Sequence, residues 1–229
     1  MAPERTDSAG GGTLSEYQQR RRFDRSTEPS GSRSAESGRT DGQPAFVVQL
    51  HDASTMHFDF RLEADGVLKS WAVPRGPSAD PHVKRFATRT EDHPLDYRDF
   101  EGVIAKGEYG GGTVMVWDEG SFQNLSKDRS GHPIPLGEAV ERGHASFRLS
   151  GAKLHGAYAL TRFRGDGDDA SWLLFKKSDR YAERDEGEDR RADARRLRSA
   201  RTGRTLHGIA DDAAAEEASG GEDASGGEQ

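Results

Sequence analysis

Apolar and polar residues alternate strictly in the segment His57–Leu62. Every second residue from Phe58 onward is apolar, and the residues between them are histidine, aspartate and arginine. Successive side chains of a β-strand point to opposite faces of the sheet, so this alternation predicts a half-buried strand. One face would bury aromatic and aliphatic side chains in a core. The opposite face would present an imidazole, a carboxylate and a guanidinium.

Short segments with strand character recur through the middle of the chain, at 46–51, 56–62, 67–73, 85–90, 113–117, 121–123, 145–149, 157–163 and 171–177. The Asp65-Gly66 pair between the second and third of these is a strong hairpin signal. Strands at roughly ten-residue intervals, separated by Gly and Pro turns, indicate a closed or nearly closed barrel. One helix is expected within this region, at 137–142. The predicted fold class is therefore mainly β, a compact β-barrel with short flanking helices and disordered N- and C-terminal tails.

Composition divides the rest of the chain into arms and tails. Ser15 could cap a helix that continues to Phe23 and ends before Pro29. The Gly/Ser/Ala-rich start and the acidic, low-complexity end of the chain predict disorder. The segment 183–201 could form a charged helix, although no apolar stripe would hold it to the barrel. The expected organisation is a disordered segment at 1–13, an N-terminal helix and arm at 14–44, the barrel domain at 45–181, a charged segment at 182–207 that could be helical, and an acidic disordered tail at 208–229.

The net charge of −7 says little about the functional surface, because the acidic excess lies at one end of the chain. Seven of the 40 acidic residues lie at 206–229, where there is no Lys or Arg, and the remaining acids equal the 33 basic residues in number. Basic clusters at 20–22, 84–85 and 190–204 are compatible with a polyanionic partner.

Cysteine is absent, which excludes disulfides and thiolate metal sites. No apolar run approaches the roughly 20 residues that cross a bilayer, and the first residues lack the hydrophobic stretch of a signal peptide. We therefore expect a cytoplasmic protein without a membrane partner. Any metal must be bound by His, Asp, Glu or water.

His51 lies six residues before His57 and could join it and Asp59 across a tight bend. Two imidazoles and one carboxylate are a usual ligand set for manganese, zinc or iron, and they leave positions open for water or substrate. Arg61 lies on the same face, roughly 6–7 Å beyond Asp59 at ~3.3 Å per residue, where it could bind a phosphate oxygen. The alternative for this pattern is a hydrated strand face with a His–Asp hydrogen bond.

Two further clusters carry groups that could contact a phosphate. His93 and Tyr97 flank a proline that forces an extended or turned chain, so both could face one pocket; a plain surface loop is the alternative. Arg75 and Arg85 lie near Pro and Gly turns and suit phosphate contacts, or else are ordinary solubilising charges. The glycine-rich loop 106–112 could let backbone approach a ligand, but a turn that opens the following strand is the favoured interpretation.

Together these stretches resemble the 3′-phosphoesterase domain family of bacterial DNA ligase D, which also occurs in free-standing proteins. Four blocks in the same order carry the similarity: FVVQLHDASTMHFDFRLEADGVLKSWAVPRGPS, TEDHPLDYRDFEGVIAKGEYGGGTVMVWDEGSF, FRLSGAKLHGAYALTRF and WLLFKKSDRYA. The resemblance covers about residues 14–181 and includes every predicted strand. The later SARTGRTLHGIA is similar to the segment that follows this domain.

The resemblance implies a β-barrel with a manganese-dependent site that resects 3′-terminal ribonucleotides and removes the remaining 3′-phosphate, in preparation for nonhomologous end joining. It implies His51, His57 and Asp59 as metal ligands. The residues that match phosphate-contacting or supporting positions are Arg61, His93, Tyr97, Arg85 and Arg75, with Arg21 and Glu28 in the N-terminal arm. The expected substrates are DNA or DNA/RNA 3′ ends at primer–template junctions. We expect a monomer that works with a separate ligase or polymerase and with Ku.

Two positions depart from the family pattern. Arg22 stands where the family has aspartate, and Arg75 replaces a lysine, which keeps the charge but changes its geometry. The reversed charge at Arg22 favours one alternative, a module that binds DNA ends with impaired catalysis. A second alternative is a cupin-like metal enzyme acting on a small molecule, because such enzymes also carry two His and an acid on barrel strands. The clustered Arg and Lys favour a polyanion over a small molecule.

Overall fold

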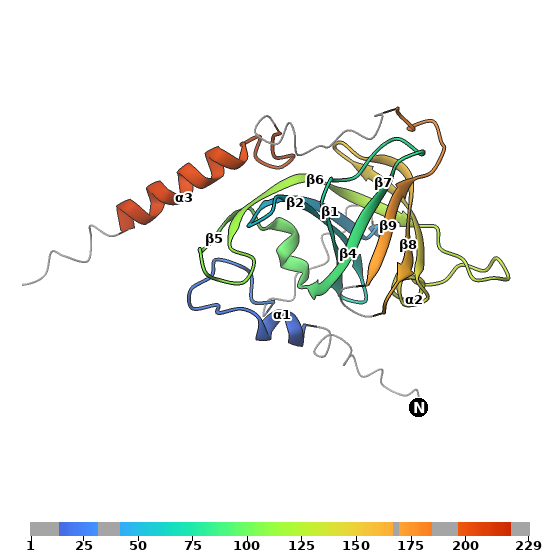
Figure 1. The fold of residues 1–229 in the computed structure, drawn as a ribbon, viewed down its shortest axis with the longest axis horizontal. Helices are drawn as coiled ribbons and strands as arrows, with labels where there is room; N and C mark the ends of the chain where they lie inside the picture. The colour runs from blue at the N-terminus through green and yellow to red at the C-terminus, as the bar shows by residue number, and fades with distance from the viewer. Residues whose placement is uncertain (1–13, 32–41, 167–169, 185–196, 221–229) are drawn as a thin grey trace, which may run out of the picture.

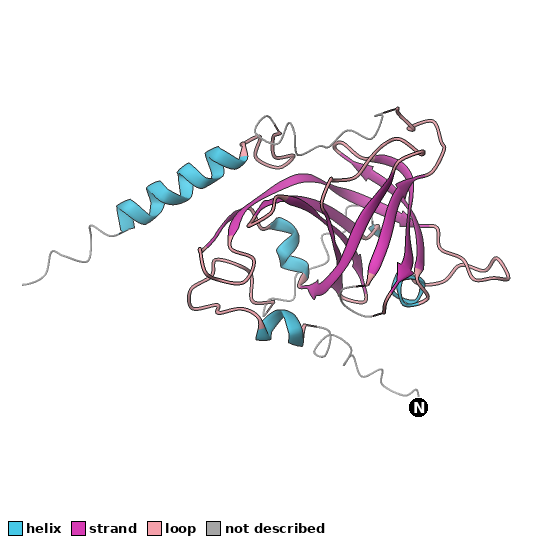
Figure 2. Cartoon of the chain, viewed as in Figure 1, coloured by secondary structure: helices cyan, strands magenta, loops and turns pink. Residues whose placement is uncertain are grey.

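The computed structural model describes residues 14–31, 42–166, 170–184 and 197–220 (Figures 1 and 2). Its strands are β1 Ala45–Asp52, β2 His57–Ala64, β3 Val67–Val73, β4 Lys84–His93, β5 Gly102–Ile104, β6 Gly112–Asn124, β7 His144–Gly151, β8 His155–Arg164 and β9 Ser171–Lys176. Its helices are α1 Ser15–Gln19, the 3₁₀ helix η2 Leu95–Asp99, α2 Leu136–Glu141 and α3 Leu206–Gly220. The mainly β fold class is therefore confirmed.

The strands of the described chain form one antiparallel sheet that closes on itself. Their order is β1-β2-β3-β4-β9-β8-β7-β6-β5, and β1 also pairs with β6. This last pairing joins the two ends of the sheet into an eight-stranded barrel, with β5 added at the edge of β6. Closure leaves few unpaired strand edges, which a sheet of short strands must otherwise protect.

The barrel interior holds the main hydrophobic core. Each of the eight barrel strands contributes buried apolar side chains to one continuous cluster. On β2 these are the residues from the alternating pattern, Phe58, Phe60 and Leu62, all fully buried. Asp65 and Gly66 both have positive φ in the turn between β2 and β3, as the hairpin signal predicts. The predicted inward face of β2 is thus confirmed.

The opposite face of the same strands is also covered, but by other parts of the chain. Tyr17 of α1, Tyr97 of η2 and Ile104 of β5 belong to a second buried cluster on the outside of the barrel. Gln49 of β1 donates to the carbonyls of Tyr97 and Phe100 at 3.1 and 2.9 Å and so fixes η2 over the sheet. The outward polar residues of β2 therefore lie beneath a roof rather than in open solvent.

Several elements differ from the sequence-based prediction. The segments 113–117 and 121–123 form one long strand, β6, because β1 and β7 pair with successive parts of it. The N-terminal helix ends at Gln19 rather than Phe23, and Leu14, not Ser15, occupies its N-cap position without a side-chain cap bond. The short elements η2 and β5 had no sequence signal. The expected disorder at 1–13 lies outside the described residues, as does the middle of the charged segment, at 185–196.

Helix α3 corrects the prediction that the chain is disordered from residue 208. Residues 208–220 are helical, and the helix extends away from the barrel wall (Figure 1). Its first turns supply Leu206 and Ile209, which are 7% and 2% exposed and join the core cluster. Acidic composition hid these two apolar anchors, because the prediction averaged over the whole tail. Residues 221–229 lie outside the described chain.

We expect Ile209→Ala to lower the free energy of unfolding by about 2–5 kcal/mol, the usual range for truncating a buried aliphatic side chain to alanine. Chemical denaturation measures this change. Ala215, which is exposed on the same helix, provides a control: Ala215→Ser should change stability by less than about 0.5 kcal/mol. Equal, small effects of the two substitutions would show that α3 does not dock in solution.

None of the helices in the described chain has the length and apolar character needed to span a membrane.

Candidate metal centre

The pairing of β1 with β2 brings the three predicted ligands together. His51 lies directly opposite His57 in the register, and Asp59 is the next outward residue of β2. Asp59 lies between the two imidazoles: Nδ1 of His51 is 3.6 Å from one carboxylate oxygen, and Nε2 of His57 is 3.6 Å from the other. The three possible donor atoms lie within 4.8 Å of one another. A single divalent ion could therefore contact all three.

Backbone carbonyls fix which nitrogen each imidazole offers. His51 donates from Nε2 to the carbonyl of Gly110 at 2.8 Å, and His57 donates from Nδ1 to the carbonyl of Thr55 at 2.8 Å. A carbonyl can only accept, so both of these nitrogens carry protons. The remaining nitrogens face Asp59 as lone pairs. Histidines that bind a metal usually donate their other ring N–H to a carbonyl or carboxylate in this way, so the donor set fits a divalent cation.

Arg61 holds Asp59 in its ionised form. The guanidinium is buried and donates to Asp59 at 3.1 Å, to Gln49 at 2.8 Å and to Ser70 at 2.9 Å. Burial alone would raise the pKa of Asp59, but the charge of the Arg61 guanidinium holds that pKa well below its ordinary value. Asp59 is thus an anion ready to bind a cation. Arg61 acts here chiefly as a fixed charge behind the ligand.

A cavity of about 270 Å³ opens over these groups. His51, His57 and Asp59 form one part of its wall, and Arg21, Arg61, His93 and Tyr97 form another. Seven of the ten predicted site residues therefore line one cavity. The lining combines a candidate metal site with two arginines, which suits a small anionic group such as a phosphate.

The N-terminal arm contributes Arg21 to this cavity. Arg21 donates to Glu28 at 2.8 Å and to Glu91 at 3.0 Å, and its guanidinium stacks 3.9 Å from the Tyr17 ring centroid. Glu28 does not line the cavity; it accepts from the Tyr97 hydroxyl at 3.0 Å. Burial and the Glu28 charge raise the pKa of Tyr97 well above its ordinary value, so the phenol stays protonated. Glu28 therefore positions two cavity residues.

His93 is held neutral. Its Nδ1 donates to the Glu91 carbonyl at 2.9 Å, and its Nε2 lies 3.3 Å from a guanidinium nitrogen of Arg21. Burial, together with the charges of Arg61 and Arg21, holds the pKa of His93 well below its ordinary value. The sequence suggested a group that could contact a phosphate at this position. In this arrangement His93 instead accepts a hydrogen bond from Arg21.

Arg85 and Arg75 are not among the residues that line the cavity. Arg85 is buried and shares the inward face of β4 with Ala87, a core residue, so its side chain starts on the far side of the sheet from the cavity. Arg75 is exposed and follows the end of β3. The sequence showed that Arg85 and Ala87 lie on the same face of their strand. It did not show which face of that strand would lie next to the site.

Three contributors to the site had no clear sequence signal. Tyr109 and Gly110 come from the loop 106–111, which is a turn, as expected, but also closes one side of the cavity. Gly110 has a φ of 75°, a conformation that favours glycine, and its carbonyl then points at His51. Glu91 accepts from Arg20 at 3.2 Å and from Arg21 at 3.0 Å, and so ties the arm to β4.

Arg22, the residue with reversed charge, lies outside the cavity. It forms a two-point ion pair with Glu108, with distances of 2.6 and 3.1 Å. The pair is largely exposed on the Arg22 side and links the arm to the loop 106–111. The charge at position 22 therefore has a local acidic partner and does not alter the lining of the candidate site.

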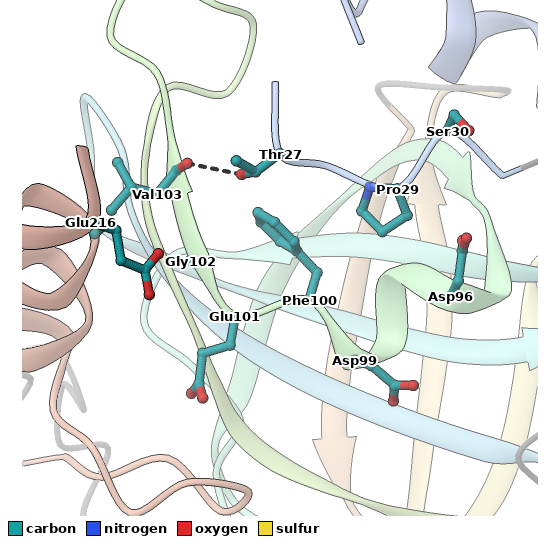
Figure 3. A pocket seen from close by; sticks show the side chains of 11 residues that line it. Thr27, Pro29, Ser30, Asp96, Asp99, Phe100, Glu101, Gly102, Val103 and Glu216 are labelled. Atoms are coloured by element: carbon teal, nitrogen blue, oxygen red, sulfur yellow. Dashed lines mark hydrogen bonds between the residues drawn. The ribbon is translucent and has the colours of Figure 1, made fainter. Parts of the chain in front are cut away.

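A larger cleft of about 710 Å³ lies between η2, β5 and α3 (Figure 3). Its lining includes the carboxylates of Asp96, Asp99, Glu101 and Glu216 around Phe100. Arg201 pairs with Asp99 at 2.7 Å, and Arg204 pairs with Glu101 at 3.4 Å. An acidic cleft repels phosphate, and the lining residues offer no histidine. Size alone therefore does not make this cleft the functional site.

Comparison with known proteins gives the same family as the sequence blocks. The model of the DNA Ligase D 3′-phosphoesterase domain matches residues 49–162. The multifunctional non-homologous end joining protein LigD of Pseudomonas aeruginosa is 48% identical over 166 residues, which is 72% of this chain and 19% of that protein. The LigD proteins of Mycobacterium tuberculosis and Mycolicibacterium smegmatis are 39% and 35% identical over 71% and 81% of this chain, and 19% and 23% of those proteins. The chain thus spans about a fifth of the length of these curated relatives.

Proposed function

The chain belongs to the DNA ligase D 3′-phosphoesterase domain family, and from this membership we propose that it is a metal-dependent phosphoesterase that processes 3′ ends of nucleic acid. Its substrates are DNA or DNA/RNA ends at primer–template junctions, from which it removes terminal ribonucleotides and 3′-phosphates. The process it serves is double-strand break repair by nonhomologous end joining, with a ligase or polymerase activity and Ku as partners.

The observation that carries this proposal is the convergence of His51, His57 and Asp59 beside two buried arginines. The residues fit one divalent cation, and manganese is the metal we propose. A bound divalent cation supplies Lewis-acid polarisation of a phosphate oxygen and can lower the pKa of a bound water. Two guanidiniums line the cavity beside the candidate ligands, which suits a terminal phosphate.

The protein groups around the cation have distinct tasks. Arg21 presents a guanidinium to the cavity and provides positive charge where negative charge grows on the phosphate oxygens. Arg61 adds a second positive charge beside Asp59 and keeps that carboxylate ionised. The Tyr97 ring, whose centroid lies 4.9 Å from the Arg61 guanidinium carbon, packs between this charge and Glu28. These groups are already hydrogen bonded, so they need little reorganisation during the reaction.

The alternative of an end-binding module with impaired catalysis rested on Arg22. Because Arg22 pairs with Glu108 outside the cavity, this residue gives no reason to expect a damaged site. The cupin-like alternative is disfavoured by Arg21 and Arg61, since two buried guanidiniums favour an anionic substrate.

The proposal is tested with a primer–template carrying a 3′-phosphate and a second carrying a terminal ribonucleotide. We expect inorganic phosphate release and primer shortening with Mn²⁺, and loss of both on addition of EDTA. Restoration by excess Mn²⁺ is the control for reversible metal removal. Full activity of the EDTA-treated protein, or no activity of the Mn²⁺-loaded protein on either substrate, would contradict the proposal.

A further inference from the structure

Two phenylalanines are conspicuously exposed on the outside of the barrel. Phe86 of β4 is 46% exposed and Phe163 of β8 is 55% exposed. Their rings meet edge to face, with centroids 6.4 Å apart. Strand β9 runs between β4 and β8 (Figure 1). The register puts Leu173 of β9 opposite both Phe86 of β4 and Thr161 of β8. We call Phe86, Phe163 and Leu173 the aromatic patch.

The strand positions around the aromatic patch carry few acidic side chains in the described part of the chain. The outward positions at 84–90 of β4 and on β9 are Lys84, Phe86, Thr88, Thr90, Ser171, Leu173 and Phe175. None is a carboxylate, and Lys84 lies 5.9 Å from the Phe175 ring centroid. At the edge of the patch, Asp166 is paired with Arg162 at 2.9 Å. Exposed apolar side chains beside a lysine are suited to a polyanion that also has flat apolar faces.

The aromatic patch is continuous with the candidate metal centre. One row of the sheet runs from Thr88 through Ala72 to Asp59, each opposite the next in the register. Ala72 lines the cavity, and Thr88 lies opposite it on β4, two residues from Phe86. At a strand spacing of ~4.8 Å, Thr88 is about 10 Å from Asp59, and Phe86 is one further step along β4. This separation corresponds to about three to four nucleotides at ~3.4 Å per nucleotide.

We propose that the aromatic patch is a stacking platform for unpaired bases of the nucleic acid whose 3′ end occupies the metal centre. The inference rests on the proposed function, because it names the part of the substrate that lies next to the reacting end. Stacking on Phe86 and Phe163 requires no particular base, since every base has a flat π face. The platform would therefore favour ends with a single-stranded segment over fully paired ends.

Binding in EDTA tests the platform without turnover. Fluorescence anisotropy is measured with two labelled 3′-phosphate substrates, a fully paired duplex and a duplex with a single-stranded extension. Replacing both Phe86 and Phe163 by leucine keeps apolar area but removes stacking, and should weaken binding of the extended duplex by about tenfold. Binding of the paired duplex should stay unchanged. The double tryptophan variant should bind at least as tightly as the original protein.

Tyr181 supplies the matched control, because it is 41% exposed but lies outside the aromatic patch. Tyr181→Leu should leave both affinities unchanged. Equal binding of the extended duplex by the double leucine variant would overturn the proposal. So would a loss of self-association in that variant, measured by light scattering, because the patch would then cover a second copy of the chain.

The two proposals fail separately. If the protein releases no phosphate with Mn²⁺ yet binding still depends on Phe86 and Phe163, the proposed activity is wrong and the platform stands. If phosphate release is normal but the double leucine variant has an unchanged KM for the extended duplex, the platform is wrong and the activity stands.

Discussion

Replacing Asp59 with asparagine is expected to abolish Mn²⁺-dependent phosphate release. Asp59 is the one anionic member of the three candidate ligands, and it lies between the free nitrogens of His51 and His57. An amide offers a weaker oxygen and no negative charge to offset the cation. Mutation of a residue that only hydrogen bonds to a metal ligand typically lowers metal affinity by about 10–100-fold. Loss of the ligand itself should therefore lower the affinity for Mn²⁺ by at least about 100-fold. Calorimetric titration with Mn²⁺ measures this directly.

Asp92 offers a matched control for Asp59. It is a carboxylate of β4 that pairs with Lys69 at 2.7 Å and with Arg89 at 2.6 Å, away from the cavity lining. Asp92→Asn should reduce stability without changing Mn²⁺ affinity. If Asp59→Asn binds Mn²⁺ normally, the proposed metal centre is refuted, whatever the activity of the variant.

Replacing Arg61 with methionine should lower the free energy of unfolding of the metal-free protein by about 3–5 kcal/mol. The guanidinium is almost fully buried. Its loss removes the hydrogen bonds that it donates to the Asp59 carboxylate and to the Gln49 and Ser70 side chains. Removing one partner of a buried ion pair is costly because the remaining charge has no compensation. Urea denaturation at neutral pH gives the value.

A divalent cation should partly rescue the Arg61→Met variant. The cation would bind Asp59 and restore a positive neighbour, and a ligand that binds only the folded state adds stability by mass action. We therefore expect saturating Mn²⁺ to raise the stability of the variant in spite of its defect. Arg98→Met is the comparison: it removes a largely surface ion pair with Asp99 at 2.9 Å and should cost less than about 1 kcal/mol. Similar losses of unfolding free energy in the two variants would show that the contacts of the buried Arg61 guanidinium do not stabilise the fold more than a surface ion pair does.

The alternation of β2 was sufficient to predict both faces of that strand. The aromatic rings had to enter a core, and the period of two then put Asp59 and Arg61 together on the other side. The spacing of His51 and His57 across a short bend likewise predicted their pairing, because antiparallel neighbours joined by a tight turn lie opposite each other. Local periodicity was enough for these residues.

Contacts between distant segments could not be predicted in the same way. The salt bridges of Arg21 to Glu28 and Glu91 depend on where the arm crosses the barrel, and no local pattern encodes that path. Arg85 shows the reverse problem. Its basic character suggested phosphate binding, but its place in the alternation of β4 put it on the inward face. The closure of the barrel through β1 and β6 decides which face becomes a site.

The orientation of the two imidazoles has a consequence for how this domain can change over generations. His51 and His57 are aimed by the carbonyls of Gly110 and Thr55, and every amino acid carries a carbonyl. Substitutions at position 55 can therefore accumulate without turning the ring of His57. The arm is held instead by ion pairs between side chains, such as Arg22 with Glu108, and reversing one charge of such a pair replaces attraction with repulsion unless the partner changes too. Sequence drift should thus be tolerated beside the metal ligands and should require paired changes along the arm.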